Sequence, residues 1–462
     1  MKLTKKSDRL GTEPIVPLLF KLSVPSIIAM AIQALYNVVD SIYVGRISTD
    51  ALSALSLTFP MQIIIIGIAV GTGVGTSSLI SRLLGKGNKK RASNAAEHVI
   101  IIAILYGIII ALLGFFYSQN LLNFFTSDTK LINIGTQYIR IIYLGSIALF
   151  FPMISNNILR GEGNTVVPMI TMLIGSIINI ILDPFFIFGI WIFPEWGVSG
   201  AAFATVFSRL ISGIFLVFIL FSDKNEIKLN FQDFKLDFSI IKSIYQVGFP
   251  AMIMQFLASF MLIGMNKILI SFSSTAVAAA GIYFRLQSFI FMPVFGLNQG
   301  YMPIVGYNYG HKNPERVKKV IKSAFLIAIA FTTTGFLLFQ LLPKQLIIMF
   351  NKDPELIRIG TRALRLISVA FPIIGPAIII SATFQALGRG LPSLLLSFLR
   401  QIIILLPLMY FLGKTTGLNY LWFAFPISEL ASMIPGAFWL RFTLKKTFKK
   451  MDREQETCSS QS

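Results

Sequence analysis

Residues 25–45 read "PSIIAMAIQALYNVVDSIYVG", and Asp40 is the one charged side chain in this run. A helix of about 20 apolar residues is long enough to cross the hydrocarbon core of a bilayer. Similar runs recur along the 462 residues, of which 55% are hydrophobic and 13% charged, whereas about 25% of the residues of a typical soluble domain are charged. The sequence therefore predicts an all-α membrane protein with many spans.

The charge pattern of the loops indicates how these spans are oriented. We predict twelve spans, at residues 15–44, 52–83, 95–117, 132–158, 165–190, 198–221, 244–272, 276–306, 320–342, 356–386, 391–412 and 418–440. Alternate loops are strongly basic, for example "RLLGKGNKKR" (82–91) and "GHKNPERVKK" (310–319). By the positive-inside rule, these loops and both termini are cytoplasmic. Orientation and attraction to anionic lipid account for the net charge of +20, so nucleic acid is not an expected partner.

The two halves of the chain are related by a shift of 225 residues. This shift superposes Pro25 on Pro250, Ala51 on Ala276, Phe59 on Phe284, Gly71 on Gly296, Gly75 on Gly300, Gly85 on Gly310, Asn88 on Asn313 and Arg91 on Arg316. Each repeat contains six spans, an even number, so both copies enter the membrane in the same orientation. We predict two parallel lobes, the arrangement of transporters that open alternately to each side of the membrane.

The repeat also sets the predicted domain boundaries. These are a cytoplasmic tail at 1–14, an N-lobe at 15–221, a cytoplasmic linker at 222–243, a C-lobe at 244–442 and a cytoplasmic tail at 443–462. The second span of each lobe contains a glycine motif, "GTGVG" (71–75) or "GLNQG" (296–300). Small residues of this kind let membrane helices approach closely and slide. No GK[ST] follows either motif and both lie inside apolar spans, so neither is a nucleotide-binding loop.

Two carboxylates lie inside spans of the N-lobe, where an Asp at the bilayer centre costs about 2.5–3.5 kcal/mol on insertion scales. Each belongs to a polar stripe on one helix face: Gln33, Tyr36, Asn37 and Asp40 on the first span, and Ser176, Asn179 and Asp183 on the fifth. Pro184 cannot donate a hydrogen bond to the carbonyl of Ile180, which leaves a spare oxygen beside Asp183. Carboxylate, amide and carbonyl oxygens together suit a small, hard cation.

The acidic pair is not repeated in the C-lobe, although the fold is. Met265 matches Asp40, and Leu406 matches Asp183 when the two prolines that follow are aligned. Two carboxylates in one low-dielectric cavity cannot both ionise cheaply, and binding a proton or Na⁺ relieves their repulsion. We therefore predict that the pair links ion occupancy to lobe conformation. Other charges inside spans, including Arg209, Arg400 and Glu429, are interpreted as structural partners of neighbouring helices.

At these residues the chain resembles the multidrug and toxic compound extrusion (MATE) family. The resemblance covers nearly the whole chain and includes "LRGEGNT" (159–165) and "NIILDPFFIFG" (179–189), in addition to the first span. It is nearest to the bacterial branch that contains the DNA-damage-inducible and staphylococcal multidrug exporters. The resemblance implies export of organic cations and other amphipathic drugs in exchange for inward H⁺ or Na⁺.

The resemblance also implies site residues. Those implied for the cation site of the N-lobe are Asp40, Asn179, Asp183, Thr205 and one of Asn156 and Asn157, with Tyr36 and Tyr138 lining the cavity. From the two polar stripes we also place Gln33, Asn37 and Ser176 in the substrate cavity. Spans seven and ten contain no acidic residue, unlike another branch of the family, so a cation site in the C-lobe is not expected. The C-lobe offers six residues as drug contacts, with ordinary packing residues as the alternative interpretation: Gln255, Gln287, Phe289, Met292, Asn298 and Gln299.

One alternative is a flippase for lipid-linked oligosaccharides, which shares the two-lobe plan but needs basic residues to hold a pyrophosphate. A second is an intramembrane enzyme, for which the chain offers no HExxH or GxSxG motif. We therefore predict a transporter and not an enzyme, with no cofactor besides the coupling ion. We expect a monomer in the inner (cytoplasmic) membrane, in contact with lipids and drug-like molecules.

Overall fold

The structure is a computed structural model that describes residues 7–222 and 225–459, and every regular element in these residues is helical. Ten described segments are long and apolar enough to cross a membrane. Two bent helix pairs bring the number to twelve when each pair is counted as one span. The all-α polytopic fold is therefore confirmed. Residues 1–6, 223–224 and 460–462 of the predicted tails and linker lie outside the described residues.

The helices follow the predicted spans closely. Those of the first half are α1 (Arg9–Thr12), α2 (Ile15–Ile47), α3 (Thr49–Gly85), α4 (Lys89–Asn123), α5 (Thr129–Leu144), α6 (Ser146–Gly161), α7 (Val166–Phe188) and α8 (Val198–Leu220). A short 3₁₀ turn, η1 (Phe231–Asp233), precedes the second half. Its elements are α9 (Phe238–Ile270), α10 (Ser274–Gly310), α11 (Pro314–Leu341), α12 (Pro343–Ile348), α13 (Pro354–Ser368), α14 (Phe371–Ala386), α15 (Gly390–Phe398), the π-helical segment η2 (Leu399–Leu405), α16 (Leu406–Thr416), α17 (Leu418–Leu421) and α18 (Ala424–Ser459).

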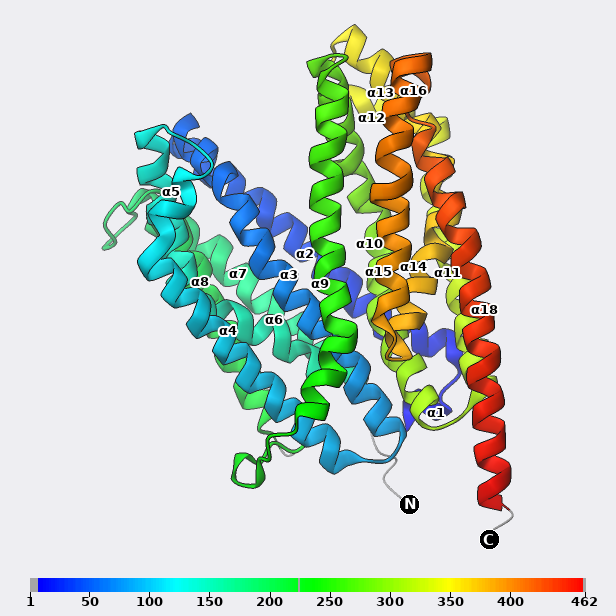
Figure 1. Cartoon of the computed structure of the whole chain (residues 1–462). Coiled ribbons are helices and arrows are strands. Elements are labelled where there is room, and N and C mark those ends of the chain that lie inside the picture. The colour runs from blue at the N-terminus through cyan, green and yellow to red at the C-terminus, as the bar shows by residue number, and fades with distance from the viewer. Residues whose placement is uncertain (1–6, 223–224, 460–462) are drawn as a thin grey trace.

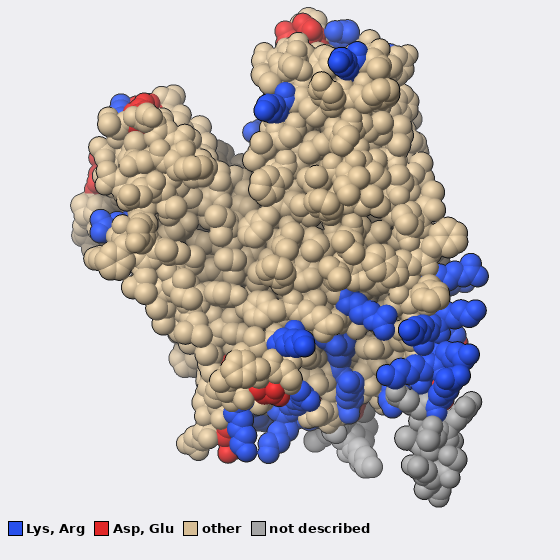
Figure 2. All heavy atoms as spheres, viewed as in Figure 1, with Lys and Arg blue, Asp and Glu red and all other residues tan. Residues whose placement is uncertain are grey.

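The helices form two lobes, α2–α8 and α9–α18, which lie together near the chain termini and diverge toward the opposite end (Figure 1). On the face drawn in Figure 2, Lys and Arg side chains gather at the end where the termini lie, and the surface is hollowed between the lobes at the other end. The contact between the lobes is made mainly by α3 with α9 and α10, and by α2 with α10.

Corresponding helices of the two lobes begin at matched capping residues. Ser48 accepts a hydrogen bond from the backbone N–H of Ala51 (3.0 Å) at the start of α3, and Ser273 accepts one from Ala276 (3.1 Å) at the start of α10. Asn caps repeat in this way at α4 and α11, and Asp caps repeat at α5 and α13. A side-chain cap stabilises the start of a helix by about 1 kcal/mol. Because the caps lie at matched positions, the two lobes repeat their helix boundaries as well as their sequence pattern.

The two bent spans occupy equivalent places in the repeat. The α5–α6 pair is bent by 53° and the α13–α14 pair by 51°. The first break is at Gly145 and the second includes Ala370, the residue that matches Gly145 under the 225-residue shift. Both lobes therefore share not only their helix order but also the bend in their fourth span.

The glycine motifs allow the lobes to touch backbone to backbone. A Cβ on Gly71 of α3 would lie 2.6 Å from the carbonyl oxygen of Gly248 in α9. A Cβ on the matching Gly296 of α10 would lie 3.0 Å from the backbone nitrogen of Ile27 in α2. The predicted close approach at these motifs is thus confirmed, and it occurs between the lobes rather than within one of them.

The segment around α1 is packed between the lobes at the terminal end. Leu10 is fully buried, and its carbonyl accepts hydrogen bonds from Asn308 Nδ2 (2.8 Å) on α10 and Arg316 Nε (3.2 Å) on α11. Arg9 Nη2 donates to the carbonyl of Gly163 (2.6 Å), which follows α6 in the N-lobe. This part of the predicted N-terminal tail therefore bridges the two lobes.

Candidate functional site

A polar cluster lies where α2, α7 and α8 pack together inside the N-lobe. Asn179 Nδ2 on α7 donates to Asp183 Oδ1 (3.2 Å) on the same helix and to Thr205 Oγ1 (3.5 Å) on α8. Asp183 and Asn179 are fully buried, and Thr205 is buried beside them. Asp40 on α2 is half-buried and close enough to Asp183 for the two carboxylates to repel each other when both are ionised.

The local sequence of α7 explains how its polar side chains reach this cluster. Ser176, Asn179 and Asp183 are three, four and seven residues apart, so they share one face of the helix. All three are buried, and the helix continues through Pro184 to Phe188. Because α7 packs against both α2 and α8, this face is turned toward neighbouring helices rather than toward lipid.

Tyrosine and arginine side chains complete the surroundings of the acidic pair. Tyr138 is buried on α5 and interacts electrostatically with Asp40, Asp183 and Tyr36. The guanidinium carbon of Arg209 on α8 lies 5.7 Å from the centre of the Tyr36 ring, a cation–π distance. The sequence interpretation of Arg209 as a structural partner did not place it at this cluster.

Several oxygen atoms of the cluster are buried without a hydrogen-bond donor among the described residues. These atoms are Asp40 Oδ1, Asn179 Oδ1 and Asp183 Oδ2. Buried polar atoms normally have a partner, and each one that does not invites an explanation. Carboxylate and amide oxygens are ligands for hard cations, including Na⁺. The donor set therefore fits a proton or a small cation. The described residues contain no group of three or more His, Cys, Asp or Glu that could hold a metal ion.

The other predicted residues of the first span are less closely tied to this cluster. Gln33 is half-buried and Asn37 is exposed on α2. No hydrogen bond joins either side chain to the α7 residues among those described. Their predicted place in the substrate cavity stays a prediction.

The two candidate asparagines of α6 differ in their surroundings. Asn157 packs against Gly73 of α3 and its Oδ1 accepts a hydrogen bond from Arg160 Nη1 (3.3 Å). The same Arg160 nitrogen donates to Gln299 Oε1 (3.4 Å) on α10, in the other lobe. Asn156 is buried and its Oδ1 has no partner among the described residues. The structure therefore places Asn157 and Gln299 at the contact between the lobes, and neither is joined to the acidic pair.

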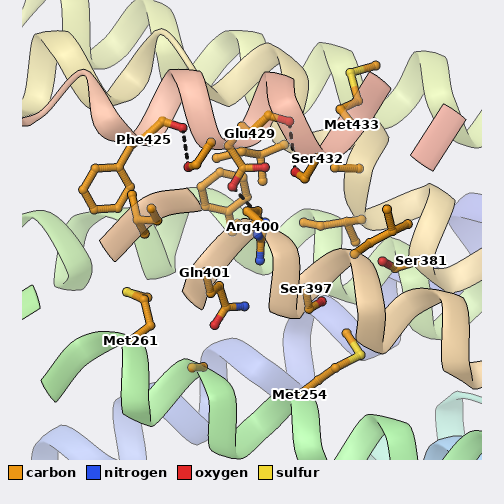
Figure 3. A pocket seen from close by; sticks show the side chains of 18 of the residues that line it. Met254, Met261, Ser381, Ser397, Arg400, Gln401, Phe425, Glu429, Ser432 and Met433 are labelled. Carbon is orange, nitrogen blue, oxygen red and sulfur yellow. Dashed lines mark hydrogen bonds and ion pairs between the residues drawn. The ribbon is translucent and has the colours of Figure 1, made fainter. Parts of the chain in front are cut away.

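A cavity of about 530 Å³ lies inside the C-lobe (Figure 3). It is lined by residues of α9, α10, α14, α15, η2 and α18, and these include Gln255, Gln287 and Asn298 of the predicted drug contacts. Met254, Met261 and Phe425 contribute apolar wall. Met and aromatic side chains can repack around ligands of different shape.

Phe289, Met292 and Gln299 do not line this cavity, and their predicted role as drug contacts stays a prediction. The α10 residues that face it are Tyr283, Phe284, Gln287, Ser288, Phe291, Phe295 and Asn298. These follow the three- and four-residue spacing of one helix face, and the side chain of Phe289 points away, with 63% of its surface exposed. Helical periodicity applied to this span separates Phe289 from these residues, but it places Met292 and Gln299 close to the face that contains Ser288 and Phe295.

An ion pair that the sequence interpretation treated as structural lies in the cavity wall. Arg400 Nη1 on η2 is 2.8 Å from Glu429 Oε1 on α18. The pairing of these two charges agrees with that interpretation, but their position in the cavity was not foreseen. No spacing in the sequence links residues 400 and 429, so only the packing of η2 against α18 brings them together.

Comparison with known proteins identifies the family. The sequence profile of the MatE family matches residues 25–185 and 250–411, one match in each lobe. The chain is 28% identical to a FAD transporter of Shewanella oneidensis, over 92% of this chain and 94% of that one. It is 26% identical to the multidrug export protein MepA of Staphylococcus aureus, over 91% and 93%. A solved outward-facing multidrug resistance transporter superposes with a TM-score of 0.90 and 28% identity, covering 97% of this chain and 100% of that chain.

Proposed function

We propose, since the chain belongs to the MatE family, that it is a secondary active exporter which moves organic cations and other amphipathic drugs outward in exchange for H⁺ or Na⁺. Relatives across this family are named as transporters or multidrug export proteins, and the chain is not an enzyme. The names of the multidrug relatives support drugs as the substrate class. The ion and the antiport mode are our proposal.

The observation that supports ion coupling most strongly is the cluster around Asp40 and Asp183. Its carboxylates are close enough to repel each other, and three of its oxygen atoms are buried without a donor among the described residues. A bound proton or Na⁺ would neutralise one negative charge and satisfy some of these oxygens. The cation-bound and cation-free forms of the cluster therefore favour different packing of α2 against α7 and α8.

Helix α2 connects this cluster to the lobe contact. It contains Asp40, and nearer its start it contains Ser23 and Ile27, which meet Gly300 and Gly296 of the C-lobe. A change in the packing of α2 at the cluster can therefore bias the contact between the lobes. A ligand shifts such an equilibrium only by its difference in affinity for the two states, and an ion that binds one arrangement of α2 better meets this condition.

We infer that the terminal end of the molecule is cytoplasmic. Most of the lysines and arginines of the visible face gather there, as the positive-inside rule requires (Figure 2). The surface between the lobes is hollowed at the opposite end, so the structure corresponds to a state open to the outside. The division into an N-lobe at 15–221, a linker at 222–243 and a C-lobe at 244–442 is retained as part of this proposal, and so is a monomer in the cell membrane.

The flippase alternative requires a buried basic site for a pyrophosphate. The N-lobe cluster instead combines two carboxylates with Arg209, which favours an exported cation.

Efflux of a fluorescent organic cation from proteoliposomes tests the proposal, with inward Na⁺ and pH gradients imposed separately. We expect one of the gradients to drive efflux in the wild type, and Asp40→Asn and Asp183→Asn to lose this response. Asp50→Asn is the matched control. Asp50 lies at the start of α3 in the same lobe, is half-exposed and pairs with Lys130 of α5. Gradient-driven efflux at wild-type rates in both cluster variants would refute the assignment.

A further inference from the structure

The cavity of the C-lobe contains charged and polar groups that the coupling mechanism does not use. Glu429 belongs to α18, and Arg400 and Gln401 belong to η2 (Figure 3). The hydroxyl of Tyr283 on α10 lies near the ion pair and interacts with it electrostatically. The acidic pair of the N-lobe lies in the other lobe, so these residues form a separate site.

The ion pair is largely removed from water but is not fully satisfied. The side chain of Glu429 is 9% exposed and that of Arg400 27% exposed. Three oxygen atoms of the group are buried without a hydrogen-bond partner among the described residues: Glu429 Oε2, Gln401 Oε1 and the Tyr283 hydroxyl. Burying charges in this way costs free energy unless the remaining lone pairs and donors also find partners. A cavity lined by such atoms is therefore suited to a polar ligand.

The backbone of η2 presents both Arg400 and Gln401 to the cavity. Neighbouring residues of an α-helix point about 100° apart, yet both of these side chains line the cavity. A π-helical turn is rare and is found frequently at functional sites. When Pro184 and Pro407 are aligned, the residue of the N-lobe that matches Arg400 is Ile177, which is exposed. As with the acidic pair of the N-lobe, the repeat alone does not require this charge.

We propose that this cavity binds zwitterionic amphipathic molecules, with an anionic group against Arg400 and an ammonium group against Glu429. The site is neutral overall, because one positive and one negative side chain face each other. A ligand with a single charge would leave one net charge in a low-dielectric cavity, whereas a zwitterion brings none. Its apolar body would contact Met254, Met261 and Phe425. This inference rests on the proposed export function for its biological role, but not for its test.

A series of dansyl compounds with one fluorophore and different charges tests the inference in purified protein held in lipid nanodiscs. Nε-dansyl-lysine has both charges, dansylcadaverine only the ammonium, and N-dansyl-aminocaproic acid only the carboxylate. We expect Nε-dansyl-lysine to bind the wild type at least tenfold more tightly than either singly charged compound, since a hydrogen bond to a charged group contributes enough for about that factor.

Single substitutions are expected to change the charge preference and not only to weaken binding. Glu429→Gln leaves Arg400 unpaired and should favour the carboxylate compound, and Arg400→Met leaves Glu429 unpaired and should favour the ammonium compound. The double variant Arg400→Glu/Glu429→Arg keeps a neutral site and should keep the preference for Nε-dansyl-lysine. If a single variant does not fold, this double variant and Tyr283→Phe provide the test. Tyr283→Phe should weaken binding of the zwitterion severalfold.

Asp40→Asn separates this inference from the coupling proposal, because it should abolish gradient-driven efflux and leave the binding of Nε-dansyl-lysine unchanged. Equal affinity of the wild type for all three compounds would overturn the inference. So would a charge preference that both single variants share with the wild type.

Discussion

Replacement of Gly71 by alanine should shift the protein toward the state that opens at the terminal end. The new Cβ would lie 2.6 Å from the carbonyl oxygen of Gly248 and 2.8 Å from the backbone nitrogen of Met252. Both atoms belong to the backbone of α9, so no side-chain rotation can relieve the overlap. Helices α3 and α9 must separate by about 0.8 Å to restore an ordinary contact of 3.4 Å.

The overlap exists only while the lobes are in contact at this end. Overpacking of this kind costs about 1–3 kcal/mol, whereas the gain in helix propensity from Gly to Ala, about 1 kcal/mol, applies to both states and cancels in their equilibrium. A shift of about 2 kcal/mol changes the ratio of the two states about thirtyfold. Gly281→Ala is the matched control, because a Cβ at this position of α10 has no neighbouring atom within 4 Å.

Distances between spin labels measure this shift directly. Phe124 and Met349 are exposed and lie in different lobes near the end opposite the termini, and Cys458 is the only native cysteine to remove. We expect the population with a short distance between labels at positions 124 and 349 to grow strongly in Gly71→Ala and to remain at the wild-type level in Gly281→Ala. Distance distributions that do not differ between the two variants would refute the argument that this contact holds the lobes together.

Two further predictions concern the terminal end. Leu10→Ala removes a fully buried side chain from the segment between the lobes, and such a change costs about 2–5 kcal/mol. The backbone amides near α1 should therefore exchange hydrogen faster than in the wild type. Unchanged exchange would contradict the bridging role of this segment. Burial raises the pKa of Glu226, but hydrogen bonds from Lys89 and Ser7 outweigh it, so the pKa is lowered overall. A lowered pKa in the folded state stabilises the protein at pH values above the ordinary pKa of glutamate. This stabilisation is lost as the pH falls through the pKa of the folded state. Glu226→Gln should therefore lower the melting temperature at pH 7 but not near pH 3, and a difference that persists there would argue against this ion pair.

Much of the fold follows from patterns that a sequence displays directly. Apolar runs and basic loops predicted the spans, and the 225-residue shift predicted two equivalent halves. The repeated caps, such as Ser48 and Ser273, and the bend at Gly145 and Ala370 show that the repeat extends to details that the pattern of apolar residues does not reveal.

The polar cluster of the N-lobe was predictable in part because periodicity places Asn179 and Asp183 on one face of a helix. Which face packs against which helix depends on the tertiary arrangement. The hydrogen bond from Arg160 to Gln299 crosses the lobe contact, and no sequence spacing relates the two lobes in that way. The π-helical turn at Arg400 is similarly not visible in the hydrophobic pattern. It is a single turn within a longer helical segment and differs from an α-helix in that its hydrogen bonds join residues five apart rather than four.

The central claim is that the cluster around Asp40 and Asp183 couples ion movement to drug movement. The most direct measurement is the ion flux that a drug gradient drives in proteoliposomes without an imposed ion gradient, recorded with a pH indicator and a Na⁺ indicator. We predict that one of the two ions moves opposite to the drug in the wild type, and that this flux is lost in Asp183→Asn and retained in Asp50→Asn. The same number of ions per drug molecule in Asp183→Asn as in the wild type would contradict the claim.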